Sequence, residues 1–128
     1  MRVLIDTHTF LWWNTDDAQL SFRAREVIAD GQNDVFLSAA SVWEIVIKTT
    51  KGKLVLPEAP AQYITHRMSL YRFRHLPIQI SHALRVYELP PYHIDPFDRM
   101  LIAQSQAECL PIVTRDESFQ QYELDIIW

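Results

Sequence analysis

Residues 2–7 read Arg-Val-Leu-Ile-Asp-Thr, an apolar run that is closed by an acid and a hydroxyl side chain. The β-branched and apolar character of 2–5 predicts a buried strand of a parallel sheet. Thr7 is a residue type that caps helices, so we expect a helix to follow it and to run through Trp13. Asp6 would then lie where the strand ends and the helix begins.

The same alternation of strand and helix continues to the end of the chain. Further strands are predicted at 35–37, 111–114 and 125–127. Helices are predicted over 21–30, 39–51, 59–73 and 81–89, and a last one opens at Asp95-Pro96, where the acid suits the N-cap and the proline the first helical position. Elements in this order form a mostly parallel sheet with helices on both faces, so the expected fold class is a three-layer α/β/α sandwich.

Length and composition set limits on both fold and function. The chain has 128 residues, of which 48% are hydrophobic and 22% charged, and this is typical of one globular domain spanning residues 1–128. The single Cys109, expected to be a buried and inert thiol, excludes an internal disulfide, and we expect a reducing, cytoplasmic location with no membrane span. Twelve Lys and Arg stand against sixteen Asp and Glu, and the net charge of −4 disfavours a general nucleic-acid binder.

Four acids are predicted to meet at one edge of the sheet. Asp6 and Asp116 follow predicted strands, while Glu44 and Asp98 lie in the first turns of predicted helices. In open parallel sheets, ligands bind outside the carboxyl ends of the strands. Carboxylates gathered there raise one another's pKa unless cations neutralise them, and their hard oxygen atoms suit Mg²⁺ or Mn²⁺.

Each acid also has a purely structural interpretation. Glu44 follows Ser41 at the spacing of a capping box. Asp98 occupies a position where an acid favours the helix dipole, and Asp116 is placed to cap a short turn. For the nearby Asp95 we favour helix capping over metal binding. Four acids at one edge nevertheless favour a site over four separate structural roles.

Four segments carry the most specific motifs of the chain. They are Val-Leu-Ile-Asp-Thr-His at 3–8, Ser-Val-Trp-Glu-Ile at 41–45 with Lys48 and Gly-Lys-Leu at 52–54 behind it, Asp-Pro-Phe-Asp-Arg-Met-Leu-Ile-Ala-Gln at 95–104, and Val-Thr-Arg-Asp at 113–116 with Phe119. Together they closely resemble the PIN domain and, within it, the VapC-type toxins of prokaryotic toxin–antitoxin systems. The resemblance extends over almost the whole chain and is most specific at the Asp-Pro-Phe-Asp-Arg helix start.

The resemblance implies a function and a set of site residues. It implies an endoribonuclease that hydrolyses RNA phosphodiester bonds with one or two Mg²⁺ or Mn²⁺ ions, is inhibited by a protein antitoxin and forms a homodimer. The family's acidic quartet falls on Asp6, Glu44, Asp98 and Asp116. Asp6 and Asp98 are expected to hold a metal most directly, and Asp116 to complete that site or a second one. Glu44 would bind or orient the attacking water.

Several polar residues adjoin the quartet in the sequence. Thr114 resembles the family's Thr-x-Asp element, and its hydroxyl is expected either to bond a phosphate or a carboxylate or to be that of an ordinary strand residue. Arg99 and Arg115 flank two of the acids. Each is expected to bind substrate phosphates, to pair with the acids or to be a solvated side chain. His8 and His93 also lie beside site segments, but we favour packing for both.

Trp12 and Trp13 are adjacent, so they cannot both point into the core from one helix. We expect one of them at the surface, where a large aromatic side chain often marks an interface. A homodimer contact or a groove for the antitoxin would account for it.

The main alternative is a PIN-fold binding module that cleaves nothing, but four mutually repelling acids would serve no purpose there. A receiver domain would need a late lysine, whereas the last lysine is Lys53; a phosphatase of the haloacid dehalogenase type would need an acid where His8 stands. Without the quartet, twelve acids remain against twelve bases. The negative charge therefore equals the expected metal site, and we expect modest RNA affinity that depends strongly on metal.

Overall fold

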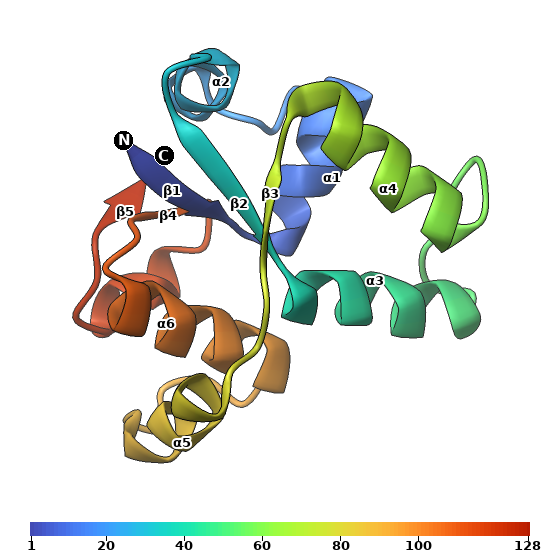
Figure 1. Cartoon of the computed structure of the whole chain (residues 1–128). Coiled ribbons are helices and arrows are strands. Elements are labelled where there is room, and N and C mark those ends of the chain that lie inside the picture. Colours follow the sequence, from blue (N-terminus) through green and yellow to red (C-terminus); the bar gives the residue numbers. More distant parts are fainter.

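The sheet contains five parallel strands in the order β3-β2-β1-β4-β5, in a computed structural model that describes residues 1–128 (Figure 1). The strands are β1 (Arg2–Ile5), β2 (Asp34–Ser38), β3 (Arg74–Leu76), β4 (Ile112–Val113) and β5 (Ile126–Ile127). The helices are α1 (Thr7–Thr15), α2 (Phe22–Ala29), α3 (Ala39–Thr50), α4 (Pro60–Tyr71), α5 (Ile80–Glu88) and α6 (Pro96–Glu108), with a short 3₁₀ helix, η1, at Glu117–Gln121.

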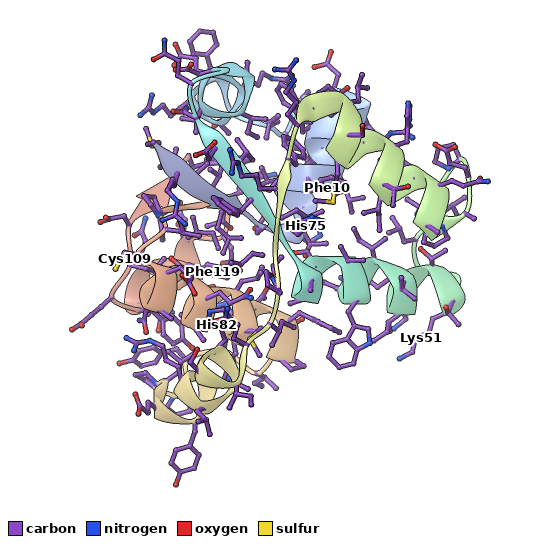
Figure 2. The ribbon with its side chains drawn as sticks, viewed as in Figure 1. Phe10, Lys51, His75, His82, Cys109 and Phe119 are labelled. Atoms are coloured by element: carbon purple, nitrogen blue, oxygen red, sulfur yellow. The ribbon has the colours of Figure 1, made fainter.

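Alternate residues of the central strand point to opposite faces and contribute to two separate cores. Val3 belongs to a cluster that includes Phe10 of α1, whereas Leu4 belongs to a second cluster that includes Phe119 of η1. Helices α1, α2 and α4 lie on one side of the sheet and α5 and α6 on the other (Figure 1). Figure 2 places Phe10 and Phe119 on these two sides. The expected three-layer α/β/α sandwich is confirmed.

Strand β3 is the one strand that the sequence pattern did not predict. It lies at the edge of the sheet and pairs only with β2, so Arg74 and His75 are exposed and only Leu76 is buried. An edge strand needs no apolar run, and the pattern of 74–76 therefore gave no strand signal. The helix before it ends at Tyr71, short of the predicted 73, because Arg72 adopts a left-handed backbone conformation with φ 58°.

Two local predictions are wrong. The N-cap of α1 is Asp6, not Thr7: the extended backbone of β1 continues through Asp6, and its carboxylate accepts a hydrogen bond from the backbone N–H of Thr9 at 2.8 Å. Cys109 is exposed rather than buried (Figure 2), because it ends α6 in a left-handed conformation at the surface. The predicted cap of α6 is confirmed, with Asp95 at the N-cap and Pro96 as the first helical residue.

Candidate active site

The four predicted acids lie at the carboxyl edge of the sheet. Strands β2 and β4 both pair in parallel with β1, so the segments that follow these three strands emerge at the same edge. Asp6 follows β1, α3 carries Glu44 beyond β2, and Asp116 lies beyond β4. The fourth acid, Asp98, lies in the first turn of α6, and its charge interacts with those of the other three. A cleft of about 400 Å³ between Asp6 and Asp116 opens beside them.

Asp6 is buried, and the protein uses both of its carboxylate oxygens. Oδ1 accepts the hydrogen bond from Thr9, and Oδ2 accepts one from the hydroxyl of Thr114 at 2.6 Å. Burial raises the pKa of Asp6, and the hydrogen bonds from Thr114 and Thr9 act against that rise. Thr9 of α1 and Thr114 after β4 therefore fix this carboxylate in one orientation.

Glu44 is also buried and held by hydrogen bonds at both oxygens. Oε1 accepts from the hydroxyl of Thr7 at 2.7 Å, and Oε2 accepts from the ammonium group of Lys48, one turn further along α3, at 2.5 Å. The N-cap of α3 is Ser38, whose hydroxyl accepts from the backbone N–H of Ala40. The capping-box interpretation of Glu44 is therefore wrong, and its carboxylate faces α1 and the site.

Asp98 differs from these two acids because its carboxylate accepts no hydrogen bond from the protein. Its backbone N–H donates to Asp95, which caps α6, but its side chain is left to the cluster of acids. Burial raises the pKa of Asp98 to about 7, and repulsion from Asp95, Glu44, Asp6 and Asp116 adds to the rise. The proton on Asp98 is thus bound more tightly because so much negative charge is gathered around it.

Asp116 is the most exposed acid of the quartet, and it caps a turn as well. Its Oδ1 accepts from the backbone N–H of Ser118 at 3.0 Å and from the hydroxyl of the same serine. Its Oδ2 lies 3.6 Å from Nε2 of His93. Burial alone would raise the pKa of Asp116, but the hydrogen bonds from Ser118 and the nearby His93 outweigh it, and the pKa is lowered.

His93 is a site residue that the sequence analysis assigned to packing. It does pack, with its ring edge-to-face against Phe119 at 5.2 Å between ring centroids. One of its imidazole nitrogens also lies within 4.8 Å of carboxylate oxygens of both Asp98 and Asp116. Its place just ahead of the Asp-Pro-Phe-Asp segment was the only signal in the sequence.

Thr114 and the two arginines have different surroundings. The buried hydroxyl of Thr114 donates to Asp6 and accepts from the backbone N–H of Asp116 at 3.0 Å, so it joins two acids of the site. Arg115 is exposed and lines the cleft, with its guanidinium 6.0 Å from the ring centre of Trp12. The guanidinium of Arg99 instead donates to backbone carbonyls of the last turn of α5 and of the α5–α6 connection, which are those of Val86, Leu89, Pro90 and His93. The structure therefore assigns Arg99 to that connection rather than to the cleft.

Both tryptophans are half-buried, contrary to the expectation that one lies at the surface. Trp12 packs between His8 and Trp128 and lines the cleft, and Trp13 packs edge-to-face against Tyr71 at 5.4 Å. The two neighbouring positions of α1 therefore pack against different partners, Trp128 at the end of the chain and Tyr71 of α4. The interface role predicted for this pair stays a prediction.

The donor set fits a hard divalent cation. Lys48 pairs with Glu44, whereas no lysine or arginine pairs with Asp6, Asp98 or Asp116. Carboxylate oxygens are the ligands that Mg²⁺ and Mn²⁺ prefer, and an added cation would remove the repulsion that raises the pKa of Asp98.

Fold and site together define a class of protein, the α/β sandwiches with an acidic site at the carboxyl edge of a parallel sheet. The PIN domain family matches residues 3–124, and the chain belongs to this family. Ribonuclease VapC16 of Mycobacterium tuberculosis is 42% identical over 59 residues, a stretch that covers 46% of this chain and 40% of that relative. No helix of the chain is long and apolar enough to span a membrane.

Solved structures of toxin–antitoxin proteins share the fold over nearly the whole chain. DNA-bound VapBC from Salmonella typhimurium has a TM-score of 0.73 and 16% identity, covering 98% of this chain and 96% of that one. VapBC2 from Rickettsia felis, bound to a promoter DNA fragment, has a TM-score of 0.72 and 15% identity, covering 98% and 97%. At these identities the likeness is one of fold.

Proposed function

We propose that this protein is a metal-dependent endoribonuclease and the toxin of a VapBC-type toxin–antitoxin pair. The observation that carries the proposal is Asp98, a half-buried carboxylate with no hydrogen-bond partner among three further acids of the quartet. A site of this kind is costly for a protein without a cation, because each carboxylate destabilises the charge of the others. The 42% identity to a ribonuclease over 59 residues supports RNA as the substrate.

Each acid has a role that follows from its contacts. Asp6, Asp98 and Asp116 would hold the cation, and Glu44 would orient the attacking water while Lys48 and Thr7 keep its carboxylate in place. One or two bound Mg²⁺ or Mn²⁺ ions would supply an activated water and neutralise charge on the scissile phosphate. Thr114 positions Asp6, and Arg115 on the rim of the cleft would contact a backbone phosphate.

The antitoxin is proposed to bind a second groove, of about 470 Å³, between α1, α3 and α4. Leu11, Leu54 and Leu56 give this groove apolar walls, and Lys53, which pairs with no acid, gives it positive charge. An antitoxin segment with apolar and acidic side chains would fit both features. Two structures that share the fold are described as VapBC complexes, which supports a protein partner. A pair of this kind would act on RNA in the cytoplasm of a prokaryotic cell.

The proposed homodimer would use α5 rather than α1. Ile80, Leu84 and Tyr87 are 81%, 68% and 94% exposed and lie on one face of this helix, at positions i, i+4 and i+7. An apolar stripe on one helix can pack against its own copy across a two-fold axis. Leu84→Asp is expected to turn the dimer into a monomer in sedimentation experiments, and an unchanged mass would exclude this face.

Cleavage of a panel of cellular RNAs, followed by mapping of the new ends, tests the proposed activity. The wild-type protein is expected to cut with Mg²⁺ or Mn²⁺, and Asp6→Asn to cut nothing while keeping its fold by circular dichroism. Glu26→Gln removes an exposed acid of α2 and is the matched control, expected to cut like the wild type. Metal-dependent cleavage by Asp6→Asn would overturn the assignment.

Thermal melting separates this proposal from a silent binding module. Millimolar Mg²⁺ or Mn²⁺ is expected to raise the melting temperature, because a ligand that binds only the folded state stabilises it. An unchanged melting temperature, together with no cleavage of any RNA, would favour the module.

A further inference from the structure

His93 enters the acidic site from the connection between α5 and α6, and the protein holds it firmly there. Its side chain is only 9% exposed. The ring packs against Phe119 and against Tyr122, whose hydroxyl accepts the backbone N–H of His93 at 2.8 Å. Its backbone carbonyl accepts from Arg99 at 3.4 Å. The imidazole therefore faces Asp116 from a fixed position.

The two nitrogens of this buried ring have different surroundings. Nε2 lies 2.9 Å from the hydroxyl of Ser118, whereas Nδ1 is buried and makes no hydrogen bond. The Ser118 hydroxyl has one hydrogen and two neighbours that can accept it, Nε2 of His93 and Oδ1 of Asp116. Nε2 also lies 3.6 Å from Oδ2 of Asp116, so it is the nitrogen that faces the acids.

The imidazole lies close to two of the acids. One nitrogen of His93 and one oxygen each of Asp98 and Asp116 all lie within 4.8 Å of one another. In an octahedral site with ligand distances of about 2.1 Å, neighbouring ligands are about 3 Å apart and opposite ligands about 4.2 Å apart. Small rotations of the Asp98 and Asp116 side chains would therefore bring their oxygens and the imidazole nitrogen onto one ion.

We infer that His93 is a nitrogen ligand of the same divalent cation that Asp98 and Asp116 bind, so that the site is a mixed imidazole and carboxylate site. Imidazole binds Mn²⁺ and later transition metals more readily than it binds Mg²⁺, which prefers oxygen. The site is then selective for Mn²⁺ over Mg²⁺. The inference rests on the proposed function only in that a cation binds among the acids.

Pulsed electron paramagnetic resonance of Mn²⁺ on the metal-free protein tests the inference without any measurement of cleavage. A nitrogen bound to Mn²⁺ gives a ¹⁴N coupling that carboxylates cannot give. The wild type is expected to show this coupling, and His93→Ala to lose it. His8→Ala is the matched control, because His8 also lines the cleft but is exposed, and it is expected to keep the coupling.

Metal titrations provide the second measurement. His93→Ala is expected to weaken Mn²⁺ binding about tenfold while Mg²⁺ binding changes little, since only the nitrogen ligand is lost. Mn²⁺ bound to the wild type without a ¹⁴N coupling, or a coupling that persists in His93→Ala, would overturn the role of His93 and leave the proposed nuclease site intact. Absence of any Mn²⁺ or Mg²⁺ binding to the wild type would overturn both.

Discussion

The two halves of the acidic site use their carboxylate oxygens in different ways. In the half formed by the N-terminal part of the chain, every oxygen of Asp6 and Glu44 accepts a hydrogen bond from the protein. In the half formed by the C-terminal part, Asp116 accepts hydrogen bonds from Ser118, but Asp98 accepts none, and the pKa of Asp98 is raised to about 7 by burial and by the charges of its neighbours. Folding thus provides hydrogen-bond donors for both oxygens of Asp6 and Glu44, whereas the carboxylate of Asp98 stays without a donor among the other acids.

This difference separates two requirements of a metal site. Asp6 and Glu44 must be oriented, and Thr114, Thr7 and Lys48 do this. Asp98 must remain available, and an acid that already accepted hydrogen bonds would have less to gain from a cation. A comparison of Asp6 with Asp98 therefore tests orientation against availability in one protein.

The largest expected effect is on RNA cleavage, and substitutions in the two halves of the site are expected to affect it alike. Asp6→Asn and Asp98→Asn each remove one proposed ligand, so each is expected to lower kcat/KM by about 10³-fold or more. Single-turnover cleavage at saturating Mn²⁺ measures it, with Glu26→Gln as the control. If Asp98→Asn retained full activity while Asp6→Asn lost it, the second half would not belong to the site.

Stability is where the two halves are expected to differ. The pKa of Asp98 is about 7 in the folded protein and 3.8 in the unfolded chain. A raised folded-state pKa stabilises the fold below pH 3.8, and this contribution disappears as the pH rises through about 7. Without metal, the wild type is therefore expected to melt at a lower temperature at pH 8 than at pH 6.

The amide of Asp98→Asn cannot ionise, so this variant lacks the repulsion that destabilises the wild type at pH 8. Without metal at that pH, it is expected to melt about 5 °C above the wild type. Asp6→Asn is expected to gain less, because Asp6 already has two hydrogen-bond donors that an amide serves less well. Melting curves of the wild type and both variants, measured from pH 5 to pH 8 in the presence of a metal chelator, test this difference. Equal shifts in melting temperature for both variants would mean that the charges of Asp6 and Asp98 destabilise the fold to the same extent.

The same contrast explains how far sequence reasoning reached. The position of an acid after a buried strand is a local property, so the edge at which Asp6 and Asp116 lie followed from the strand pattern. The hydroxyls that hold Asp6 and Glu44 come from Thr114 and Thr7, which are 108 and 37 positions away from their acids. No local pattern encodes contacts of that separation.

Three further features show the same limit. The edge strand β3 carries exposed residues because one of its sides has no neighbour, and this depends on the assembled sheet. Arg99 and His93 both adjoin the Asp-Pro-Phe-Asp helix start, yet the arginine fastens the α5–α6 connection and the histidine faces the acids. Packing against α5 and η1 decides the direction in which each of these two side chains points. Their closeness to the helix start in the sequence therefore could not separate their roles.

The next prediction tests orientation in the first half alone. Thr114→Val keeps the shape of the side chain but removes the hydroxyl that donates to Asp6 and accepts from the backbone N–H of Asp116. Because Thr114 is buried, the unpaired groups are expected to cost about 1–3 kcal/mol of unfolding free energy. A misaligned Asp6 should also lower kcat about tenfold. Thr114→Ser, which keeps the hydroxyl, is expected to restore most of both, and a serine variant as poor as the valine variant would point to lost packing instead.

The smallest expected effect is that of Arg115, which lies between Thr114 and Asp116 in the sequence but forms no ion pair with the acids of the site. It donates to Gln19 at 2.8 Å and lies over Trp12, so its charge is held at the rim of the cleft, where the phosphates of a substrate would pass. One phosphate contact outside the reacting centre contributes to binding rather than to the chemical step, and its loss should reduce the salt dependence of binding by about one unit of slope.

Arg115→Ala is therefore expected to raise KM about threefold and leave kcat unchanged, because binding lost equally in substrate and transition state appears in KM alone. Arg23→Ala removes an exposed arginine of α2 and serves as the control. A fall in kcat for Arg115→Ala would instead place the guanidinium at the scissile phosphate, and the site would then use a protein cation together with its metal.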